Sequence, residues 1–379
     1  MKVRVAILGQ GLVASHFEVG LELLRAGEIK PYGVPLAEAP LPYRPEDVEV
    51  VVAYDVDDSK VGKTAYDVVA SVGGLPTPKG LKDIEVRRGI SLGSARGMPY
   101  SSKGLEESIG LEPAIGSLVD DWRSLGVDVV VNVITTEKGE PFGSAEALSR
   151  AIRTGDPRLT ASHAYAYALA EYASGRGAAF VNSIPTPLAN DGGVIELYRE
   201  RGAVVFGDDG ATGATPLTAD LLEHMAERNR KVEFVVQFNI GGNTDFLALT
   251  DPGRNSMKEA TKGGIVGDIL GYDAPHYIRP TGYLEPLGDR KFVAMHLSYI
   301  SFNGAVDDVY VLARINDSPA LAGILVDLVR LAKISLDRGL RGTVYEVNAF
   351  YMKRPGPPGS RSIAKILAFS GLKRWLGVS

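Results

Sequence analysis

The sequence predicts an α/β protein built on a doubly wound parallel sheet, together with a second, α+β domain. Residues 3–24 read as a buried strand, a glycine turn and a helix, which is the opening unit of nucleotide-binding sheets. From about residue 292 this alternation gives way to paired, half-buried strands, which favours an α+β arrangement. A length of 379 residues is enough for two domains.

The composition is ordinary for a globular protein, with 45% hydrophobic and 23% charged residues. A formal net charge of -5 gives no support for nucleic-acid binding, and no apolar run approaches the ~20 residues of a membrane span. The absence of cysteine excludes disulfides, thiolate zinc sites and cysteine nucleophiles. The five histidines show no ligand spacing, so no metal site is predicted. We expect a cytoplasmic protein that acts on a small molecule, without nucleic-acid or membrane partners.

The first strand, Val3–Leu8, leads into the pattern Gly-x-Gly-x-x-Ala at residues 9–14. The first glycine permits a tight turn, and the second lets the backbone approach a pyrophosphate. The N-terminus of the following helix would face the phosphates. Four residues of this turn are therefore predicted to bind a dinucleotide: Gly9, Gly11, Leu12 and Val13.

An acidic residue, Asp55, ends the second predicted strand at residues 48–54. At that position a carboxylate can accept hydrogen bonds from the adenosine ribose, which favours NAD over NADP. An ordinary turn acid is the alternative, because the usual spacing of ~20 residues after the glycines is exceeded. A proline-rich insertion, residues 32–45, accounts for the difference. Residues 75–118 are expected to form a long excursion that covers the cofactor.

Polar residues follow three further predicted strands, at 127–134, 178–182 and 203–206. In doubly wound folds, ligands lie at the carboxyl ends of such strands. For the Gly-Asp-Asp-Gly segment at 207–210 a simple turn remains the alternative. The predicted cofactor contacts at these strand ends are Thr135, Thr136, Ser183 and Asp208.

A polar stretch from residue 237 to 291 follows the predicted strand 232–240. Lys258 and Lys262 lie four residues apart and would share one helix face. Two ammonium groups at such a short distance repel each other. Either both face water, or they bind an anion, or one of the two lysines has a lowered pKa. Three polar residues precede the pair around a Gly-Gly turn that suits close approach to a ligand: Asn239, Asn243 and Asp245.

The last third of the chain is predicted to contain strands at 292–301 and 309–315, a long helix that begins near Asp317, and a last strand at 344–350. Locally, Asp317 is better explained as a helix cap, and Lys353 as a solvated loop lysine.

An ordered set of motifs resembles the myo-inositol-1-phosphate synthase family, in its compact archaeal and bacterial branch. The resemblance covers nearly the whole chain. Its motifs are Gly9-Gln-Gly11, Gly207-Asp-Asp209, Gly242-Asn-Thr-Asp245, Ser256-Met-Lys258 with Lys262, Gly288-Asp-Arg-Lys291, Asn316-Asp-Ser-Pro319 and Phe350-Tyr-Met-Lys353.

The resemblance implies a Rossmann domain for NAD at residues 1–235 plus 318–379, and an inserted catalytic and oligomerisation domain at 236–317, in a homotetramer. The implied reaction is the redox-neutral conversion of glucose 6-phosphate to 1D-myo-inositol 3-phosphate. It proceeds by oxidation at C5, loss of a proton at C6, aldol closure onto C1 and reduction of the ketone. Such chemistry needs several cationic groups to bind phosphate and to stabilise an enolate.

The resemblance also implies residue roles. Lys262 and Lys291 would transfer protons and stabilise oxyanions, while Lys258 and Lys353 would hold phosphate or relay protons. Asp317 would orient a lysine or contact the nicotinamide, near Asp208. The implied catalytic residues are Lys258, Lys262, Lys291, Lys353 and Asp317. The implied substrate contacts are Asn239, Asn243, Asp245 and Ser256.

One segment departs from the family pattern. After Gly-Asp-Asp the family has a longer loop that contains a lysine, whereas this chain reads Gly-Ala-Thr-Gly-Ala-Thr at 210–215. The departure leaves three hypotheses open: the cyclase, an NAD-dependent dehydrogenase or cyclase of another sugar phosphate, and an NAD-binding regulatory paralogue.

Overall fold

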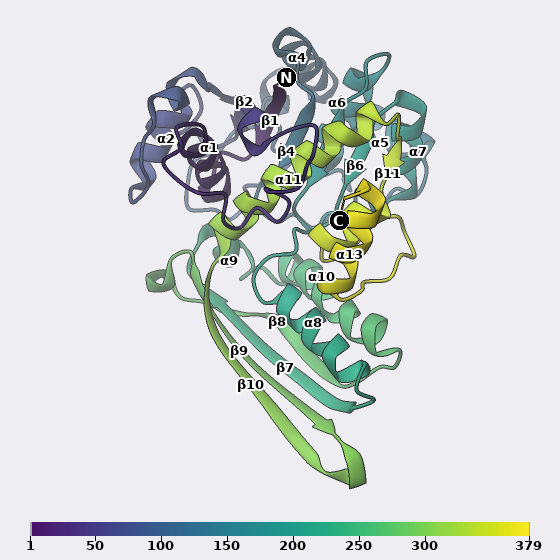
Figure 1. The fold of residues 1–379 in the computed structure, drawn as a ribbon. Helices are drawn as coiled ribbons and strands as arrows, with labels where there is room; N and C mark the ends of the chain where they lie inside the picture. The colour runs from purple at the N-terminus through teal and green to yellow at the C-terminus, as the bar shows by residue number, and fades with distance from the viewer. Residues whose placement is uncertain (1, 379) are drawn as a thin grey trace.

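The computed structural model describes residues 2–378, except for the side chains of 260–263 within helix α10 (Pro252–Leu270). Over this part of the chain two sheets form (Figure 1). The first has seven strands in the order β11-β6-β5-β4-β1-β2-β3, and all its pairs are parallel. The second has four strands in the order β10-β9-β7-β8. The predicted doubly wound α/β fold with an additional α+β part is confirmed.

The seven-stranded sheet is covered by helices on both faces, which explains its short, almost wholly apolar strands. In β1, Val3, Val5 and Ile7 point into a core with α1 and α11, whereas Ala6 and Leu8 point into a core with α4, α6 and α7. The strands are β1 (Val3–Leu8), β2 (Val48–Asp55), β3 (Val86–Arg88), β4 (Val129–Asn132), β5 (Ala179–Asn182), β6 (Val204–Phe206) and β11 (Gly342–Thr343). The helices of this part are α1 (Leu12–Arg25), α2 (Ala65–Val72), α3 (Glu106–Ile109), α4 (Leu111–Leu125), α5 (Ala145–Thr154), α6 (Ala161–Ala173), α7 (Gly192–Arg201), α11 (Asp317–Asp337), α12 (Tyr345–Tyr351) and α13 (Lys365–Leu376).

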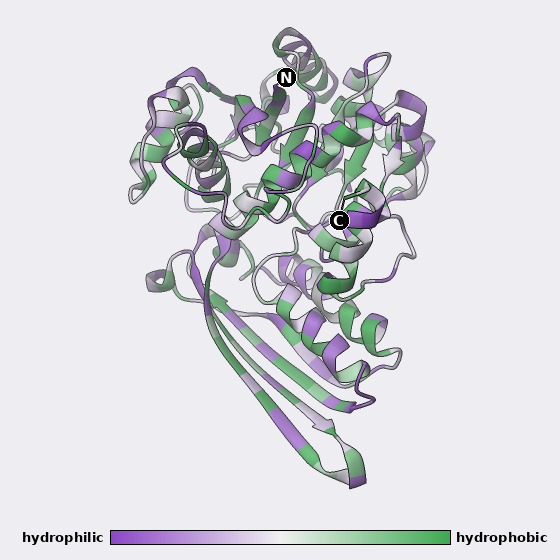
Figure 2. Ribbon diagram, in the orientation of Figure 1, coloured by the Kyte–Doolittle hydropathy of each residue, from purple (hydrophilic) through white to green (hydrophobic). Residues whose placement is uncertain are grey.

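The four-stranded sheet is covered on one face, by α8 and α10. Its strands are β7 (Lys231–Gly241), β8 (His276–Tyr283), β9 (Arg290–Ile300) and β10 (Val306–Asn316), and its helices are α8 (Thr215–Ala226), α9 (Thr244–Ala248) and α10. Hydrophobic and hydrophilic segments alternate along the long strands, as a sheet with one open face requires (Figure 2). The predicted domain boundary at 235/236 lies inside β7, and the division itself stays a prediction. Among the described helices, none combines the length and the hydrophobicity of a membrane span.

Two predicted elements are wrong. Residues 344–350 do not form a strand, because 345–351 form helix α12, whose buried Val347 and Tyr351 have the i, i+4 spacing of one helix face. The excursion at 75–118 is regular in part, since residues 86–88 add β3 to the sheet and residues 111–125 form α4. Tertiary packing on both sides of the sheet orders these segments.

A buried charge network joins the proline-rich insertion to α11. Arg330 pairs with Asp327, and the Arg330 guanidinium also donates to the Tyr43 carbonyl at 3.0 Å. The Asp327 carboxylate accepts from the Leu36 backbone N–H at 2.8 Å and from the Tyr351 hydroxyl at 2.7 Å. Asp327 and Arg330 are both almost fully buried. The proline-rich insertion is therefore attached to the core by polar contacts that could not be predicted from its sequence.

We expect Arg330→Met to lower the free energy of unfolding by about 3–5 kcal/mol, because it leaves the Asp327 carboxylate buried without its counter-charge. Urea unfolding measures the loss. Arg123→Met is the matched control, since Arg123 pairs with Asp120 at the exposed surface and should change stability by under about 1 kcal/mol. Equal effects of the two substitutions would contradict the prediction.

Candidate active site

A cavity of about 440 Å³ lies at the carboxyl edge of the seven-stranded sheet, where it faces the second sheet. Segments that follow four parallel strands form one wall, as expected for a doubly wound fold. The first wall consists of residues 9–13, 54–57, 133–135 and 183–184. The other includes Asp209, Gly210, Thr212, residues 243–245, Lys258, Asp317, Ser318, Leu321 and Lys353.

The glycine turn after β1 borders this cavity. Gly9 has a φ of 96°, and a Cβ built there would lie 2.9 Å from the Cα of Ile134, so only glycine fits. Gly11 is the N-cap of α1, and a Cβ built there would meet no protein atom within 4 Å. Gly11 thus faces open space in front of a helix N-terminus, which is the arrangement that receives a phosphate. The four predicted contacts of the turn all line the cavity: Gly9, Gly11, Leu12 and Val13.

The carboxylate of Asp55 lines the cavity and is already hydrogen-bonded on both oxygens. One oxygen accepts from the backbone N–H groups of Val56 and Asp57, and the other accepts from the Gln10 N–H at 2.9 Å and the Lys60 ammonium at 3.1 Å. Burial would lower the pKa of Lys60, but Asp55 and Asp57 outweigh it and raise that pKa. Lys60 was not predicted as a site residue, because it belongs to no motif, although it follows Asp55 by only five residues.

The predicted contacts after β4 and β5 lie at different depths. Thr135 and Ser183 line the cavity, and the buried Ser183 hydroxyl has no hydrogen-bond partner among the described groups. Thr136 does not line the cavity. Its hydroxyl donates to the carboxylate of Asp245, which does, at 2.8 Å. Ser183 therefore offers a donor and an acceptor to a ligand, whereas Thr136 positions a carboxylate.

Asp208, predicted to contact the cofactor, does not line the cavity. Its carboxylate is fully buried and accepts from Asn182 and from the backbone N–H groups of 188–190. Burial raises the pKa of Asp208 to about 6 despite these bonds. The neighbouring Asp209 lines the cavity instead. The two adjacent acids point to opposite sides of the turn, and the sequence did not indicate which of them lines the cavity.

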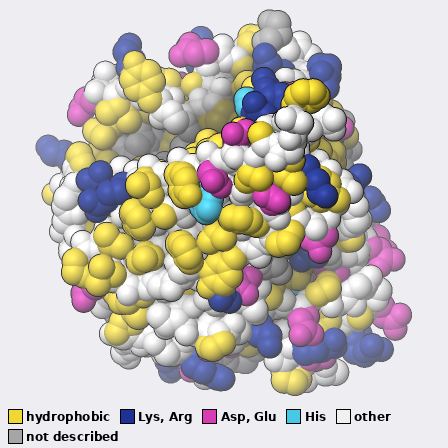
Figure 3. All heavy atoms as spheres, turned by 90° about the horizontal axis from the view of Figure 1, so that it is seen from below, with side chains coloured by type: hydrophobic (Ala, Val, Ile, Leu, Met, Phe, Trp, Pro, Cys, Tyr) yellow, Lys and Arg dark blue, Asp and Glu magenta, His cyan; other side chains and the backbone are white. Residues whose placement is uncertain are grey.

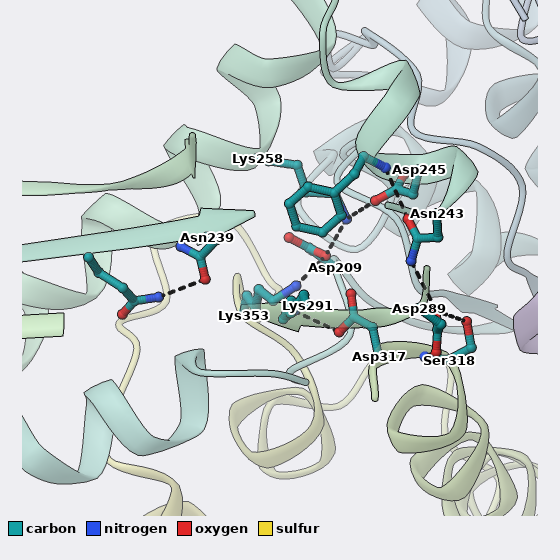
Figure 4. A network of polar contacts seen from close by, with 12 residues as sticks. Asp209, Asn239, Asn243, Asp245, Lys258, Asp289, Lys291, Asp317, Ser318 and Lys353 are labelled. Atoms are coloured by element: carbon teal, nitrogen blue, oxygen red, sulfur yellow. Dashed lines mark hydrogen bonds and ion pairs between the residues drawn. The ribbon is translucent and has the colours of Figure 1, made fainter. Parts of the chain in front are cut away.

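Three lysines and three carboxylates converge at the junction of the two sheets (Figure 4). They come from α10, β9, the end of α12, the loop after β6, α9 and the start of α11. The Lys291 ammonium is 2.7 Å from Asp317, and Lys353 is 2.9 Å from Asp209. Lys258 is 3.3 Å from Asp209 and 3.6 Å from Asp245. We call these six residues the lysine cluster.

Burial and charge act differently on members of the lysine cluster. Burial lowers the pKa of Lys353, and the nearby charges of Lys258 and Lys291 lower it further, against the opposing effect of Asp209. For Lys258, Asp209 and Asp245 outweigh burial and raise the pKa. Burial favours a raised pKa for Asp317, but the lysines outweigh it and lower that pKa. Lys353 thus loses its proton more readily than Lys258, which stays charged.

The loop after β6 makes room for Lys291. Gly213 has a φ of 68°, and a Cβ built there would collide with the Lys291 ammonium. The same Cβ would lie 3.6 Å from the carboxylate of Asp317. Gly213 therefore leaves the space in which the Lys291–Asp317 pair forms.

The predicted substrate contacts do not all meet. Asn243 and Asp245 line the cavity, and Asn243 caps α9 while donating to Asp289 at 3.0 Å. Asn239 lies deeper, beside a small recess that it shares with Lys258 and Lys291, and donates to the Arg279 carbonyl.

Ser256 is exposed, lines none of the cavities described here and donates to the Gly253 carbonyl of its own helix at 2.7 Å. The structure thus does not bring Ser256 to the cavity, because two residues along a helix turn the side chain away from that of Lys258, and its role as a substrate contact stays a prediction. Lys262 lies outside the residues whose side chains the structure describes.

Comparison with known proteins identifies relatives along the whole chain. A family model described as myo-inositol-1-phosphate synthase matches residues 213–318. An inositol-3-phosphate synthase of Corynebacterium glutamicum is 29% identical over 93% of this chain and 93% of its own length. An inositol-3-phosphate synthase of Mycobacterium tuberculosis (strain CDC 1551) is 30% identical over 93% of this chain and 91% of its own.

Two solved structures extend the comparison. A myo-inositol-1-phosphate synthase-related protein of Thermotoga maritima is 57% identical, with a TM-score of 0.94 over 100% of this chain and 99% of its own. Inositol-3-phosphate synthase of Caenorhabditis elegans has the same fold, with a TM-score of 0.82 at 17% identity over 99% of this chain and 85% of its own. The chain belongs to the myo-inositol-1-phosphate synthase family.

Proposed function

We propose that the protein is an NAD-dependent, redox-neutral cyclase that converts D-glucose 6-phosphate into 1D-myo-inositol 3-phosphate. The observation that carries this proposal is that the glycine turn and five residues of the lysine cluster border one cavity, while the sixth, Lys291, lines the small recess beside it. Oxidation of a sugar hydroxyl, enolisation and aldol closure all develop negative charge on oxygen, which fixed ammonium groups stabilise. Relatives named inositol-3-phosphate synthase at 29–30% identity support the same reaction.

NAD fits the first wall of the cavity. Gly11 and the N-terminus of α1 leave room for a pyrophosphate, and the unpartnered Ser183 hydroxyl offers a further polar contact. Asp55 and Asp57 supply two carboxylates at this wall, and Lys60 is the one lysine paired with them. The excess negative charge would repel the 2′-phosphate of NADP, which favours NAD. When bound, NAD would accept a hydride from the sugar and return it after ring closure.

The electrostatics of the lysine cluster suggest a division of roles. Lys353, with its lowered pKa, is the candidate to accept the proton at C6. Lys291, held by Asp317, would stabilise an oxyanion, and the charged Lys258 would bind phosphate or enolate oxygen. Asn243 and Asp245 would contact sugar hydroxyls. This division moves proton transfer from the pair implied by the resemblance, Lys262 and Lys291, to Lys353.

The pH dependence of turnover should move when Asp209 is neutralised. A lysine base works in its neutral form, so turnover should rise with pH through the pKa of Lys353. Because Asp209 raises that pKa, Asp209→Asn should lower it further and shift the rising limb to lower pH. The pH profile of kcat measures the shift, with the exposed Asp120→Asn as control. A shift to higher pH, or none, would exclude Lys353 as the titrating group.

The function is tested by incubating the protein with NAD⁺ and glucose 6-phosphate while following phosphorus NMR and NADH absorbance together. Inositol phosphate without net NADH supports the cyclase. Accumulation of NADH favours a dehydrogenase, which remains the second candidate because the loop at 210–215 lacks the family lysine. Absence of product with every sugar phosphate tried, despite NAD binding, would favour a regulatory protein.

We further propose that copies of the chain cover the open face of the second sheet, in a homotetramer. Exposed apolar side chains lie in register across it: Leu312 on β10 is opposite Ala294 on β9, which is opposite Phe238 on β7. Leu312 is 75% and Phe238 43% exposed. Seen from the end where these long strands project, the molecule shows many exposed hydrophobic side chains (Figure 3). Such patches are typical of subunit interfaces.

We expect Leu312→Asp to convert the assembly into smaller species in sedimentation velocity, because a charge buried at an interface without a partner is costly. Leu367→Asp, on a 44% exposed leucine of α13, is the matched control and should leave the assembly unchanged. A wild-type protein that sediments as a monomer would contradict the proposed tetramer.

A further inference from the structure

A second cavity of about 840 Å³ lies next to the cofactor cavity, with Ser94 on the boundary of both. We call it the Arg254 cleft. It is lined by segments of the loop after β3, the loop after β4, the turn before α6 and the N-terminal part of α10. These segments are residues 92–98, 137–140, 157–160 and 247–254. Neither the predicted site residues nor the lysine cluster belong to it.

Four cations line its wall, and three of them are available to bind an anion, because the fourth, Arg158, is paired with Asp156 at 2.8 Å. Arg254 is 9% exposed, and one guanidinium nitrogen donates to the carbonyls of Ser94 at 2.9 Å and Arg96 at 3.0 Å. The other terminal nitrogen, Nη1, has no acceptor among the described residues. Arg96 and Lys138 are exposed, and neither forms an ion pair with a described residue.

The carboxylates on the same wall are mostly engaged elsewhere. Glu137 is buried and accepts from the backbone N–H groups of Ala161 and Ser162 and from the Ser162 hydroxyl. Asp251 caps α10 by accepting from the backbone N–H of Arg254 at 3.0 Å. Glu140 and Asp251 are the exposed acids of this wall, against three cations that lack a carboxylate partner among the described residues. The uncommitted charge that faces the cleft is therefore positive on balance.

Arg254 also connects the cleft to the neighbouring cavity. Its guanidinium holds the loop at Ser94 and Arg96, and Ser94 and Ala95 form part of the wall of the cofactor cavity. On α10, Arg254 lies one turn before Lys258 of the lysine cluster. A ligand that fixes Arg254 and Arg96 would therefore also fix a wall of the cofactor cavity.

We propose that the Arg254 cleft binds a phosphate group through Arg254, Arg96 and Lys138, and that its occupation strengthens nucleotide binding in the adjacent cavity. Guanidinium and ammonium groups are the usual phosphate ligands in proteins, and an unpaired buried guanidinium nitrogen favours such an acceptor. The phosphate is either free or part of a metabolite, since the cavity leaves room for an organic remainder.

Calorimetric titration of the full chain with inorganic phosphate tests the binding. The cleft variant is Arg96→Ala with Lys138→Ala, and the control, Arg123→Ala with Lys30→Ala, removes the same charge from exposed positions elsewhere. We expect about tenfold weaker phosphate binding, or more, in the cleft variant and no change in the control. A wild-type protein that does not bind phosphate, or equal affinities in all three proteins, would overturn the proposal.

Two further titrations complete the test. Glycerol phosphate in place of inorganic phosphate separates the two sources, because tighter binding of the ester assigns the cleft to a metabolite. NAD titrations with and without phosphate measure the coupling, which should tighten NAD binding about fivefold in wild type and not in the cleft variant. Phosphate that binds the cleft without changing NAD affinity would refute the coupling. Both substituted side chains are exposed, and thermal unfolding checks that the variants fold.

Discussion

Lys353→Met is expected to lower turnover by about 10³-fold while NAD binding persists, because the substitution removes the group proposed to accept the proton. Methionine retains an unbranched apolar stem in a position that is 7% exposed. Asp209 keeps its contact with Lys258 at 3.3 Å, so no buried carboxylate loses its only counter-charge. Turnover follows from inositol phosphate formation, and NAD binding from fluorescence titration.

Lys30→Met is the control for this substitution, since Lys30 is exposed and lies outside the cavities described above. It should leave turnover unchanged. A Lys353→Met enzyme with turnover close to wild type would remove Lys353 from the chemistry. A simultaneous loss of NAD binding would instead indicate that Lys353 holds the cavity together.

Two alanine substitutions in the glycine turn are expected to have different effects. Gly9→Ala should lower the free energy of unfolding by about 2–4 kcal/mol, because the residue has a φ of 96° and its Cβ would crowd Ile134. Gly11→Ala should leave stability almost unchanged, because its Cβ meets no protein atom. It should nevertheless weaken NAD binding at least about tenfold, since the added methyl would occupy the space proposed for the pyrophosphate.

Urea unfolding and NAD titration of both variants separate stability from binding. Gly20→Ala is the control, because Gly20 lies within α1 and a Cβ there also meets nothing within 4 Å. It should stabilise the helix by about 0.5–1 kcal/mol and leave NAD binding unchanged. Unaltered NAD affinity in Gly11→Ala would show that the dinucleotide does not lie over this turn.

Most strands of the seven-stranded sheet could be predicted, because an apolar run bounded by turns is a local signal. β8 was not predicted, since its segment, His276–Tyr283, holds a proline and few buried residues and pairs only at the sheet edge beside β7. Helix α12 was mistaken for a strand, because a short segment with apolar residues at alternate positions satisfies both periods.

The candidate site was predicted in its chemistry better than in its geometry. The motifs pointed to Lys258, Lys291, Lys353 and Asp317, which the structure brings together from three helices or their ends and one strand. Within the motif at 207–209, however, only tertiary structure decides which acid turns toward the cavity. Lys60 and Arg254 belong to no motif. Lys60 matters because it contacts Asp55 at the cavity, and Arg254 because it donates to a backbone carbonyl that is distant along the chain.

The sequence by itself determined the fold class, the glycine turn and the family, because each depends on residue type at fixed local spacing. Tertiary structure decided the charge state of the lysines, the orientation of Asp209, the room that Gly213 gives to Lys291, and the positive Arg254 cleft. These properties depend on burial and on distances between atoms of different elements. Burial and these distances are set only when the two sheets pack against each other, and so no local sequence pattern predicts them.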